Sequence, residues 1–167
     1  MVEYKNGIKY REFYELINPE VAYFNPFAVQ IHGITYEDVQ HEKNFAELWE
    51  EMLPFIEGKT LVAHNAKFDN AVLLHSLQRY GIELPQYTSF CTLQRSRNLI
   101  RLPSYKLSSL AIFFEVPQFH HHNALEDAFV CGELFLKLNR VEEELQLQEK
   151  HGIDFPSSYL DWIAEKQ

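Results

Sequence analysis

The residues that carry the clearest chemical meaning lie in the segment FHHHNALEDAFVC, at positions 119–131. This segment predicts an amphipathic helix that begins after Asn123. In that helix Asp127 falls three residues after Ala124 and four before Cys131, on the apolar side. A buried carboxylate is costly unless something compensates its charge, and a divalent metal ion would do so. Asp127 is therefore a candidate metal ligand, and an ordinary aspartate of the first helical turn is the alternative.

His122 stands just outside the start of this helix and is a candidate general base. Asn123 is a good N-cap with Glu126 at the third helical position, which puts His122 near the positive end of the helix dipole. This field disfavours imidazolium and keeps the imidazole neutral, as a general base requires. His120 and His121 are interpreted as loop residues, because adjacent histidines cannot easily face one tetrahedral zinc ion. A zinc-dependent hydrolase is therefore not favoured.

A second constellation lies in the segment LVAHNAKFDNAVL, at positions 61–73. Its apolar start predicts a buried strand whose C-terminal end delivers His64 and Asn65 to a helix that begins near Phe68. Asp69 lies in the first turn of that helix, and the neighbouring Phe68 ring is available to the core or to a flat ligand. Junctions between strands and helices are where α/β proteins keep their chemistry. These four residues are therefore candidate site residues.

Charge is distributed unevenly along the chain, whose formal net charge is −9 at pH 7. Such a net charge argues against a general polyanion-binding protein. The interval between Glu83 and Glu115, however, contains no acidic residue. Its cations are Arg95, Arg97, Arg101 and Lys106. This strip predicts contacts with phosphate groups, and an ordinary solvated helix face is the alternative.

Periodicity and turn signals predict the α/β elements that must position these residues. Alternating residues on both sides of Asn6-Gly7 indicate a β-hairpin. A helix is expected from the N-cap Asn44 to Gly58, with a kink at Pro54. The remaining pattern predicts strands over 60–63 and 89–92, and helices from 68, over 104–114 and over 124–138.

Length and composition favour a single domain. The chain has 167 residues, of which 46% are hydrophobic and 14% aromatic, which is enough for one buried core and a site. Residues 1–140 are predicted to form the domain and residues 141–167 a C-terminal helical appendage. No membrane span and no signal peptide is found, so a cytoplasmic protein without membrane contact is expected. Cys91 and Cys131 are interpreted as small buried hydrophobes rather than a disulfide or metal pair.

Together these motifs resemble those of the DEDDh 3′–5′ exonucleases, the family of the proofreading epsilon subunit of bacterial DNA polymerase III. The specific feature is H-N-x-x-F-D followed 58 residues later by H-x-x-x-x-D. The matching segments are INPE at 17–20, IHGIT at 31–35, HNAKFD at 64–69, CTL at 91–93 and HHNALEDA at 121–128. The resemblance covers residues 1–138. It implies a ribonuclease H-like α/β fold, with a mixed central sheet flanked by helices.

The resemblance also implies a two-metal phosphodiesterase site with two Mg²⁺ or Mn²⁺ ions, which oxygen ligands suit. Asp127 would bind the ion on the nucleophile side, and Asp69 would serve the second ion largely through water. His122 would deprotonate the attacking water, while His32 and Phe68 match positions that contact the 3′-terminal nucleotide. The full set of candidate substrate-binding residues is His32, His64, Asn65, Phe68, Arg95, Arg97, Arg101 and Lys106.

The implied function is removal of nucleotides from the 3′ ends of single-stranded DNA, in proofreading or repair. RNA is an alternative substrate, and a DNA polymerase subunit is an expected partner. A catalytically inactive remnant of the same fold, which binds nucleic acid or protein, is the alternative function.

The sequence departs from the family at its first motif, an Asp-x-Glu on the first and central strand. That motif supplies two of the four metal-binding carboxylates, and no equivalent is found in this chain. The sheet is therefore expected to lack its central strand. Either strand 2–5 closes against strand 60–63, or self-association fills the gap. Weak metal binding and impaired activity are expected of the chain as given.

Overall fold

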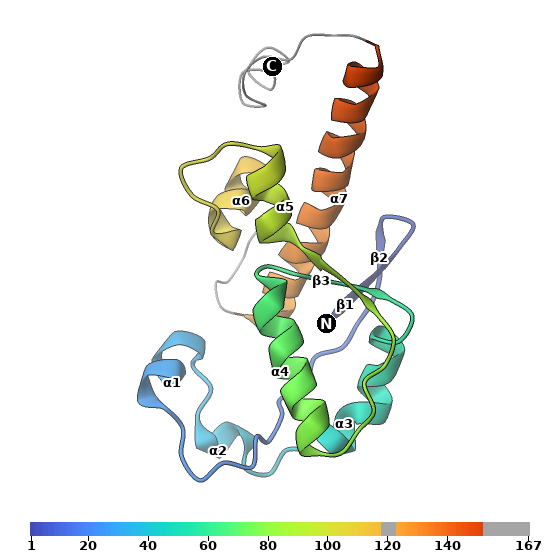
Figure 1. The fold of residues 1–167 in the computed structure, drawn as a ribbon. Coiled ribbons are helices and arrows are strands. Elements are labelled where there is room, and N and C mark those ends of the chain that lie inside the picture. Colours follow the sequence, from blue (N-terminus) through green and yellow to red (C-terminus); the bar gives the residue numbers. More distant parts are fainter. Residues whose placement is uncertain (118–122, 152–167) are drawn as a thin grey trace.

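A computed structural model describes residues 1–117 and 123–151, apart from the side chains of 148 and 149 (Figure 1). The predicted hairpin is confirmed: β1 (Val2–Lys5) pairs antiparallel with β2 (Ile8–Glu12). Asn6 and Gly7 join the strands with φ angles of 52° and 76°. A two-residue hairpin turn needs such left-handed angles, and Asn and Gly tolerate them best. The turn residues alone therefore specify this element.

Two short helices follow, α1 (Pro26–His32) and α2 (Tyr36–Val39). Neither was predicted, because segments of this length show no full hydrophobic period. The Asn25 side chain accepts a hydrogen bond from the Phe27 N–H at 2.9 Å, and Gly33 ends α1 with a φ of 74°. No residue of α1 is buried, so capping rather than packing defines it. Figure 1 shows α1 and α2 at the edge of the molecule, away from the long C-terminal helix.

The helix predicted after Asn44 is present as α3 (Phe45–Met52), which continues into the 3₁₀ turn η1 (Leu53–Phe55). The Asn44 side chain accepts from the Glu47 N–H at 3.0 Å, and the Glu47 carboxylate accepts from the Asn44 N–H at 2.8 Å. This is the expected capping box. Pro54 lies where the α-helix gives way to the 3₁₀ turn. The helix packs into a core made of Phe45, Trp49, Ile56 and Leu77.

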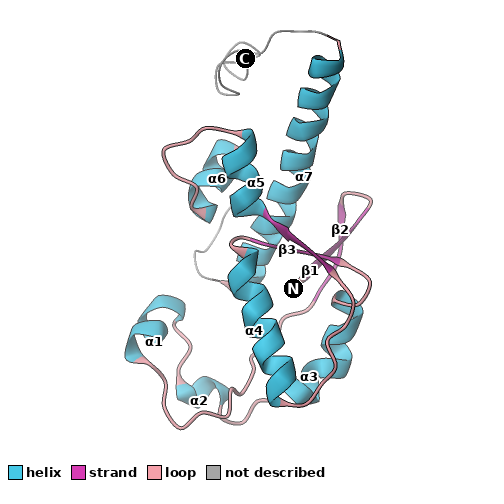
Figure 2. Cartoon of the chain, in the orientation of Figure 1, coloured by secondary structure: helices cyan, strands magenta, loops and turns pink. Residues whose placement is uncertain are grey.

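A βαβ unit positions the candidate site. It consists of β3 (Thr60–Ala63), α4 (Ala66–Arg79) and β4 (Thr88–Cys91), close to the predicted ranges. The two strands pair in parallel, with Ala63 opposite Cys91 at their C-terminal ends. Both strand ends, and the helices that follow them, therefore lie at one edge of this sheet (Figure 2).

Three further helices build the second core: α5 (Thr92–Leu99), α6 (Leu107–Phe113) and α7 (Ala124–Lys150). Its largest fully buried side chains are Ile100, Leu110, Leu134 and Leu138. The helix predicted over 104–114 begins only at Leu107. Lys106 before it is still extended, and the Tyr105 backbone carbonyl accepts a hydrogen bond from the His64 ring.

α7 extends through the boundary predicted at residue 140. The helix expected to end at 138 continues to Lys150, because Val141 is buried against the second core and Leu145 packs on it. The division into a domain over 1–140 and an appendage over 141–167 stays a prediction, and 152–167 lie outside the described residues. Neither α7 nor any other helix within 1–117 and 123–151 is long and apolar enough to cross a membrane.

The fold is α/β, but the described strands form two separate two-stranded sheets rather than one mixed sheet. Among these residues no backbone ladder joins β1 to β3, so the predicted closure of the sheet does not occur in that form. Side chains link the two sheets instead. Lys59 Nζ lies 2.9 Å from Glu3 Oε1, and Met1 and Leu61 pack into the same core. Self-association through the gap stays a prediction.

α7 forms a seam with β1. The Tyr4 ring occupies the space in which a Cβ on Gly132 would stand. The Tyr4 hydroxyl lies 3.0 Å from the Glu133 carboxylate, to which it donates, and 3.3 Å from the Phe129 carbonyl. Because α7 also contacts β3, this helix holds the hairpin and the parallel pair together without a shared ladder.

Candidate active site

The candidate site lies at the C-terminal edge of β3 and β4. Ala63 and Cys91 end the two strands side by side, and α4 and α5 begin immediately afterwards. In open α/β sheets this is the edge where ligands bind. The sequence analysis located the first of these junctions, and the parallel register brings the second one beside it.

The His64 ring is held between two distant segments. Its Nε2 donates to the Tyr105 carbonyl at 2.9 Å, because a carbonyl can only accept, and its Nδ1 then accepts from the Thr92 hydroxyl at 3.0 Å. Desolvation lowers the pKa of this imidazole, and the positive charge of Arg97 acts in the same direction. The predicted contact of His64 with substrate therefore competes with partners inside the protein, and it stays a prediction.

Asp69 lies in the first turn of α4, as predicted. The residue is exposed as a whole, yet partial desolvation of its carboxyl raises the pKa. Its own backbone N–H and the nearby His64 offset this effect only in part. The raised pKa means that the anionic form is under-compensated in the folded protein, which a metal ligand requires.

Asp127 lies in the first turn of α7 and is half-buried. The predicted cap is present: the Asn123 side chain accepts from the N–H groups of Leu125 and Glu126 at 3.0 and 3.2 Å. The Asp127 N–H donates to the Asn123 carbonyl at 2.9 Å. This helix start therefore holds Asp127 in a defined position.

Cys131 connects the two aspartates in space. Burial, chiefly, and the negative charges of Asp127 and Asp69 raise the pKa of its thiol to about 12, against a hydrogen bond from the His64 backbone N–H that lowers it. The charges of carboxylates on α4 and α7 thus act on the same buried group, although 58 residues separate them in the sequence. The interpretation of Cys131 as a buried free thiol is confirmed.

Cys91 sits where α4 and α5 begin, which sequence reasoning did not foresee. Desolvation alone would raise the pKa of its thiol, but hydrogen bonds from surrounding backbone N–H groups outweigh it and lower the pKa. Those groups belong to Gln94, Ala66, Asn65 and Leu93. The parallel pairing of β3 and β4, each of which leads into a helix, brings the starts of α4 and α5 together around the Cys91 thiol.

The remaining uncharged candidates take different positions. Asn65 precedes α4 with a φ of 71°, a left-handed angle that asparagine tolerates better than most residues. Phe68 is 66% exposed, so its ring faces solvent rather than the core. His32 ends α1, and its Nδ1 accepts from the Ile34 N–H at 3.0 Å, which leaves Nε2 to donate in the neutral ring. Their roles toward substrate stay predictions.

The four cations of the basic strip are not equivalent. Arg95 forms an ion pair with Glu142 on α7, with 30% and 29% of their side chains exposed. Arg97 is exposed, its guanidinium lies 5.7 Å from the centroid of the Tyr105 ring, and its charge reaches His64. Arg101 and Lys106 are exposed. Arg97 is thus close enough to the strand ends to act on His64, whereas the ion pair of Arg95 with Glu142 would compete with a phosphate contact.

His122 lies outside the described residues, as do His120 and His121, so the predicted general base stays a prediction. Within 1–117 and 123–151 no group of three or more histidine, cysteine or acidic residues is arranged to hold a metal ion. The carboxylates of Asp69 and Asp127 are hard oxygen donors of the kind that Mg²⁺ and Mn²⁺ take. They fit one part of a divalent metal site, and the predicted pair of ions stays a prediction.

Comparison with known proteins identifies the family. Residues 1–135 match the RNase T family model, described as exonuclease. The chain belongs to this exonuclease family. The resemblance inferred from the motifs is thereby confirmed, and the family is one of nucleic-acid hydrolases.

Two relatives of this exonuclease domain are considerably longer than the chain. DNA polymerase III PolC-type from Caldanaerobacter subterraneus subsp. tengcongensis is 34% identical over 154 residues, which are 92% of this chain and 11% of the relative. The 3′-5′ exonuclease DinG of Bacillus subtilis is 30% identical over 135 residues, which are 80% of this chain and 14% of the relative. The chain therefore spans only a small part of the length of either protein.

A solved structure supports the fold. Exonuclease X in complex with 5′ overhanging duplex DNA matches with a TM-score of 0.67 and 24% sequence identity. The match covers 85% of this chain and 81% of the other. The expected ribonuclease H-like exonuclease fold is confirmed by this likeness.

Proposed function

We propose that this exonuclease domain hydrolyses nucleotides from the 3′ end of single-stranded DNA in a metal-dependent reaction of the proofreading or repair type. The observation that carries the proposal is that Asp69 and Asp127 lie in the first turns of α4 and α7 and that their charges both act on the Cys131 thiol. Their carboxylates are hard oxygen donors of the kind that Mg²⁺ and Mn²⁺ take. The names of the relatives, a PolC-type DNA polymerase III and a 3′-5′ exonuclease, support DNA and this polarity.

Asp69 and Asp127 would hold the divalent ion, Mg²⁺ or Mn²⁺. When bound, such an ion polarises the phosphate and lowers the pKa of a water molecule. His122 is proposed to accept the proton of the attacking water. The water oxygen would form a bond to the phosphorus of the terminal nucleotide, while the bond between that phosphorus and the 3′ oxygen of the penultimate nucleotide breaks. Two carboxylates cannot hold two ions securely, so we expect weak metal affinity and a low rate from this chain.

Two further residues suit the substrate. Arg97 is exposed beside His64, so its guanidinium is proposed to contact a backbone phosphate near the strand ends. The Phe68 ring is exposed one residue before Asp69 and is proposed to stack on the 3′-terminal base. The stacking role of Phe68 favours single-stranded substrate, because an unpaired base is free to stack on a side chain.

A binding remnant without catalysis is the second candidate. Two observations on the described residues favour it: the strands form two separate sheets, and no group of three or more histidine, cysteine or acidic residues is arranged to hold a metal ion. Such a protein would bind single-stranded DNA through the same cations and rings, and a polymerase subunit would be its partner.

One experiment separates the two candidates. A single-stranded oligonucleotide labelled at its 5′ end is incubated with the protein and Mn²⁺, and the products are resolved by length. Shortening from the 3′ end that EDTA stops, and that Asp127→Asn removes, supports the enzyme. Binding without shortening at high protein concentration supports the remnant, and neither binding nor shortening refutes both.

A further inference from the structure

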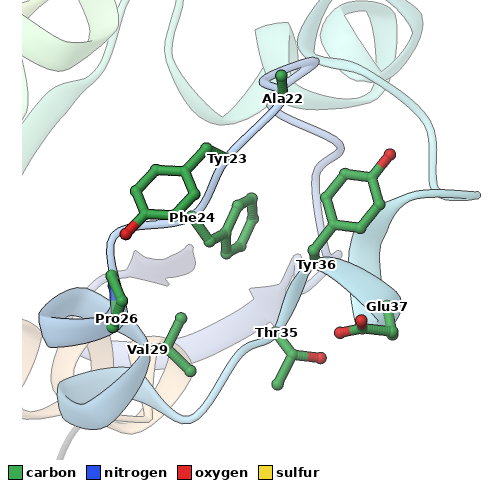
Figure 3. A pocket seen from close by; sticks show the side chains of 8 residues that line it. All are labelled: Ala22, Tyr23, Phe24, Pro26, Val29, Thr35, Tyr36 and Glu37. Atoms are coloured by element: carbon green, nitrogen blue, oxygen red, sulfur yellow. The ribbon is translucent and has the colours of Figure 1, made fainter.

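The α1–α2 segment carries an aromatic hollow that none of the candidate site residues lines. It has a volume of about 440 Å³ and is lined by Tyr23, Phe24, Val29 and Tyr36, among others. In Figure 3 the rings of Tyr23 and Tyr36 stand on either side of Phe24. No residue of β3, α4 or α7 lines it. The hollow is therefore a feature in its own right.

Its rings are unusually open to solvent. Tyr23 is 72% exposed and Tyr36 43%. Phe24 and Tyr36 meet edge to face, with centroids 6.1 Å apart and planes at 81°. Phe24 between them is half-buried. Two exposed tyrosine rings beside a hollow are typical of a binding surface rather than of a core.

The hollow is held in shape by hydrogen bonds at the helix ends rather than by packing. Gly33 closes α1 by donating to the Val29 carbonyl at 2.7 Å. At the start of α2, the Thr35 N–H and hydroxyl both donate to the Asp38 carboxylate, at 2.7 and 2.8 Å. These bonds define the direction of the chain at Tyr36. A ligand would therefore meet rings that are already positioned.

We propose that this hollow binds a nucleobase of single-stranded DNA, as a stacking subsite in addition to the proposed contact of Phe68 with the 3′-terminal base. The proposal rests on the proposed function and names a second contact for the same substrate. Aromatic rings bind bases of any sequence, because every base has a π-face. Glu37 on the rim carries the only formal charge of the lining and would repel phosphate, so the uncharged base rather than the backbone fits inside.

The size of the hollow favours a base over a protein partner. Eight residues line it, whereas a standard protein interface uses roughly 20–30 residues on each side. From residue 21 to residue 36 the sequence contains no lysine, arginine or acidic residue. Apart from Glu37, the hollow therefore offers flat aromatic contact without the extended polar rim that protein interfaces usually have.

The test measures binding of a fluorescently labelled oligodeoxythymidylate by anisotropy, in EDTA so that no digestion occurs. Tyr23→Ala should weaken binding about 10-fold, the scale of one lost stacking contact, whereas Tyr23→Trp should retain it. Tyr23 is largely exposed, so its removal leaves the fold intact. The matched control is Tyr10→Ala, which removes a 58% exposed tyrosine from β2 and should leave the affinity unchanged.

A second arm uses oligonucleotides with one abasic position, moved along the strand. At one position the missing base should weaken binding to the unmodified protein but not to the Tyr23→Ala variant, because the contact is then already lost. Equal losses at every position in both proteins would show that the ring does not contact a base. Unchanged affinity in both Tyr23→Ala and Tyr36→Ala would overturn the subsite while leaving the proposed function standing. Absence of any oligonucleotide binding by the unmodified protein would overturn both.

Discussion

The hairpin and the strand ends of β3–β4 each hold a carboxylate that is partly removed from water, and they treat it in opposite ways. In the hairpin, a hydrogen bond from Lys59 at 2.9 Å, together with the Arg11 guanidinium, lowers the pKa of Glu3 against the effect of desolvation. At the strand ends, desolvation raises the pKa of Asp69, and its neighbours offset this only in part.

The difference separates a structural carboxylate from a candidate ligand. Glu3 has its counter-charges supplied by the protein, so it ties β1 to β2 and to the start of β3. Asp69 is under-compensated, so a cation from solution would stabilise its charged form. Shifted pKa values of this second kind point to functional sites, whereas the first kind marks an ion-pair network.

The largest expected effect is on catalysis. Asp127→Asn and Asp69→Asn should each lower the rate of 3′ digestion on the order of 100-fold or more, because each removes a carboxylate charge from the site. Glu3→Gln should digest DNA at the rate of the unmodified protein once the rate is divided by the amount of folded protein, because Glu3 acts on stability rather than on catalysis. Initial rates with Mn²⁺ on labelled single-stranded DNA measure the contrast. Equal rates for Asp127→Asn and the unmodified protein would show that Asp127 is no more a metal ligand than Glu3 is.

The next effect concerns the seam that joins the hairpin to α7. Gly132→Ala should destabilise the protein by about 1–3 kcal/mol, because the new methyl group collides with the Tyr4 ring, which its hydroxyl bonds hold in place. In a Tyr4→Ala background the same change should instead stabilise by up to about 1 kcal/mol, since alanine favours helix over glycine.

Urea unfolding of the four proteins in this cycle gives the result. A loss of equal size in both backgrounds would mean that contact with Tyr4 is not what requires glycine at this position.

A smaller effect distinguishes the cations of the strip. Arg97→Gln should weaken binding of oligodeoxythymidylate several-fold and reduce the slope of log affinity against log salt by about 0.7, the value for one phosphate on a single strand. Arg95→Gln should leave the slope unchanged, because Glu142 already occupies that guanidinium. Lys9→Gln on the hairpin is the control. If Arg95 rather than Arg97 changes the slope, the ion pair does not persist in solution.

The smallest effect is that the contributions of Glu3 and Asp69 to stability change in opposite directions with pH. The pKa of Glu3 is lowered, so its contribution to stability is present above its unfolded pKa and is lost as pH falls through the folded pKa. The pKa of Asp69 is raised, so stability is greatest below its unfolded pKa and decreases as pH rises through the folded pKa.

At neutral pH, therefore, Glu3→Gln should lower the melting temperature and Asp69→Asn should raise it slightly. Both differences should shrink as the pH falls: that of Asp69→Asn as the pH falls through the raised folded pKa toward the unfolded one, and that of Glu3→Gln as the pH falls below the unfolded pKa toward the lowered folded one. Thermal melts at pH 7 and pH 3.5 compare the variants. Shifts of the same sign for both variants at pH 7 would contradict the comparison.

Local sequence signals located much of the fold and part of the site. The Asn6-Gly7 turn, the Asn44 capping box and the Asn123 cap are all present, because each depends on atoms within a few residues. Asp69 and Asp127 were found for the same reason, since both lie in first helical turns next to recognisable caps or strands. Helix ends were less certain: the charged stretch after 140 suggested a boundary, yet its apolar residues continue the buried face of α7.

Contacts over long sequence separations could not be foreseen. His64 was interpreted only from its position where a strand meets a helix, but its ring is hydrogen-bonded to the Tyr105 carbonyl, 41 positions away in the sequence. Arg95 belonged to an acid-free interval of the sequence, yet its counter-ion comes from α7. The rings of the hollow follow no helical period, because Tyr23 and Phe24 lie in the loop before α1 and only Tyr36 belongs to a helix.

The amino-acid sequence by itself determined the hairpin, several helix starts, the positions of Asp69 and Asp127 in first helical turns, and the family to which the chain belongs. Motifs, turns and caps each depend on residues that are neighbours in the sequence. The tertiary structure decided which carboxylate is compensated and which is not. It let the charges of Asp69 and Asp127 act on one thiol, gave Arg95 a partner while leaving Arg97 exposed, and kept the two described sheets apart. The physical reason is that charge compensation and desolvation depend on distance in space, which only the packing of distant segments sets.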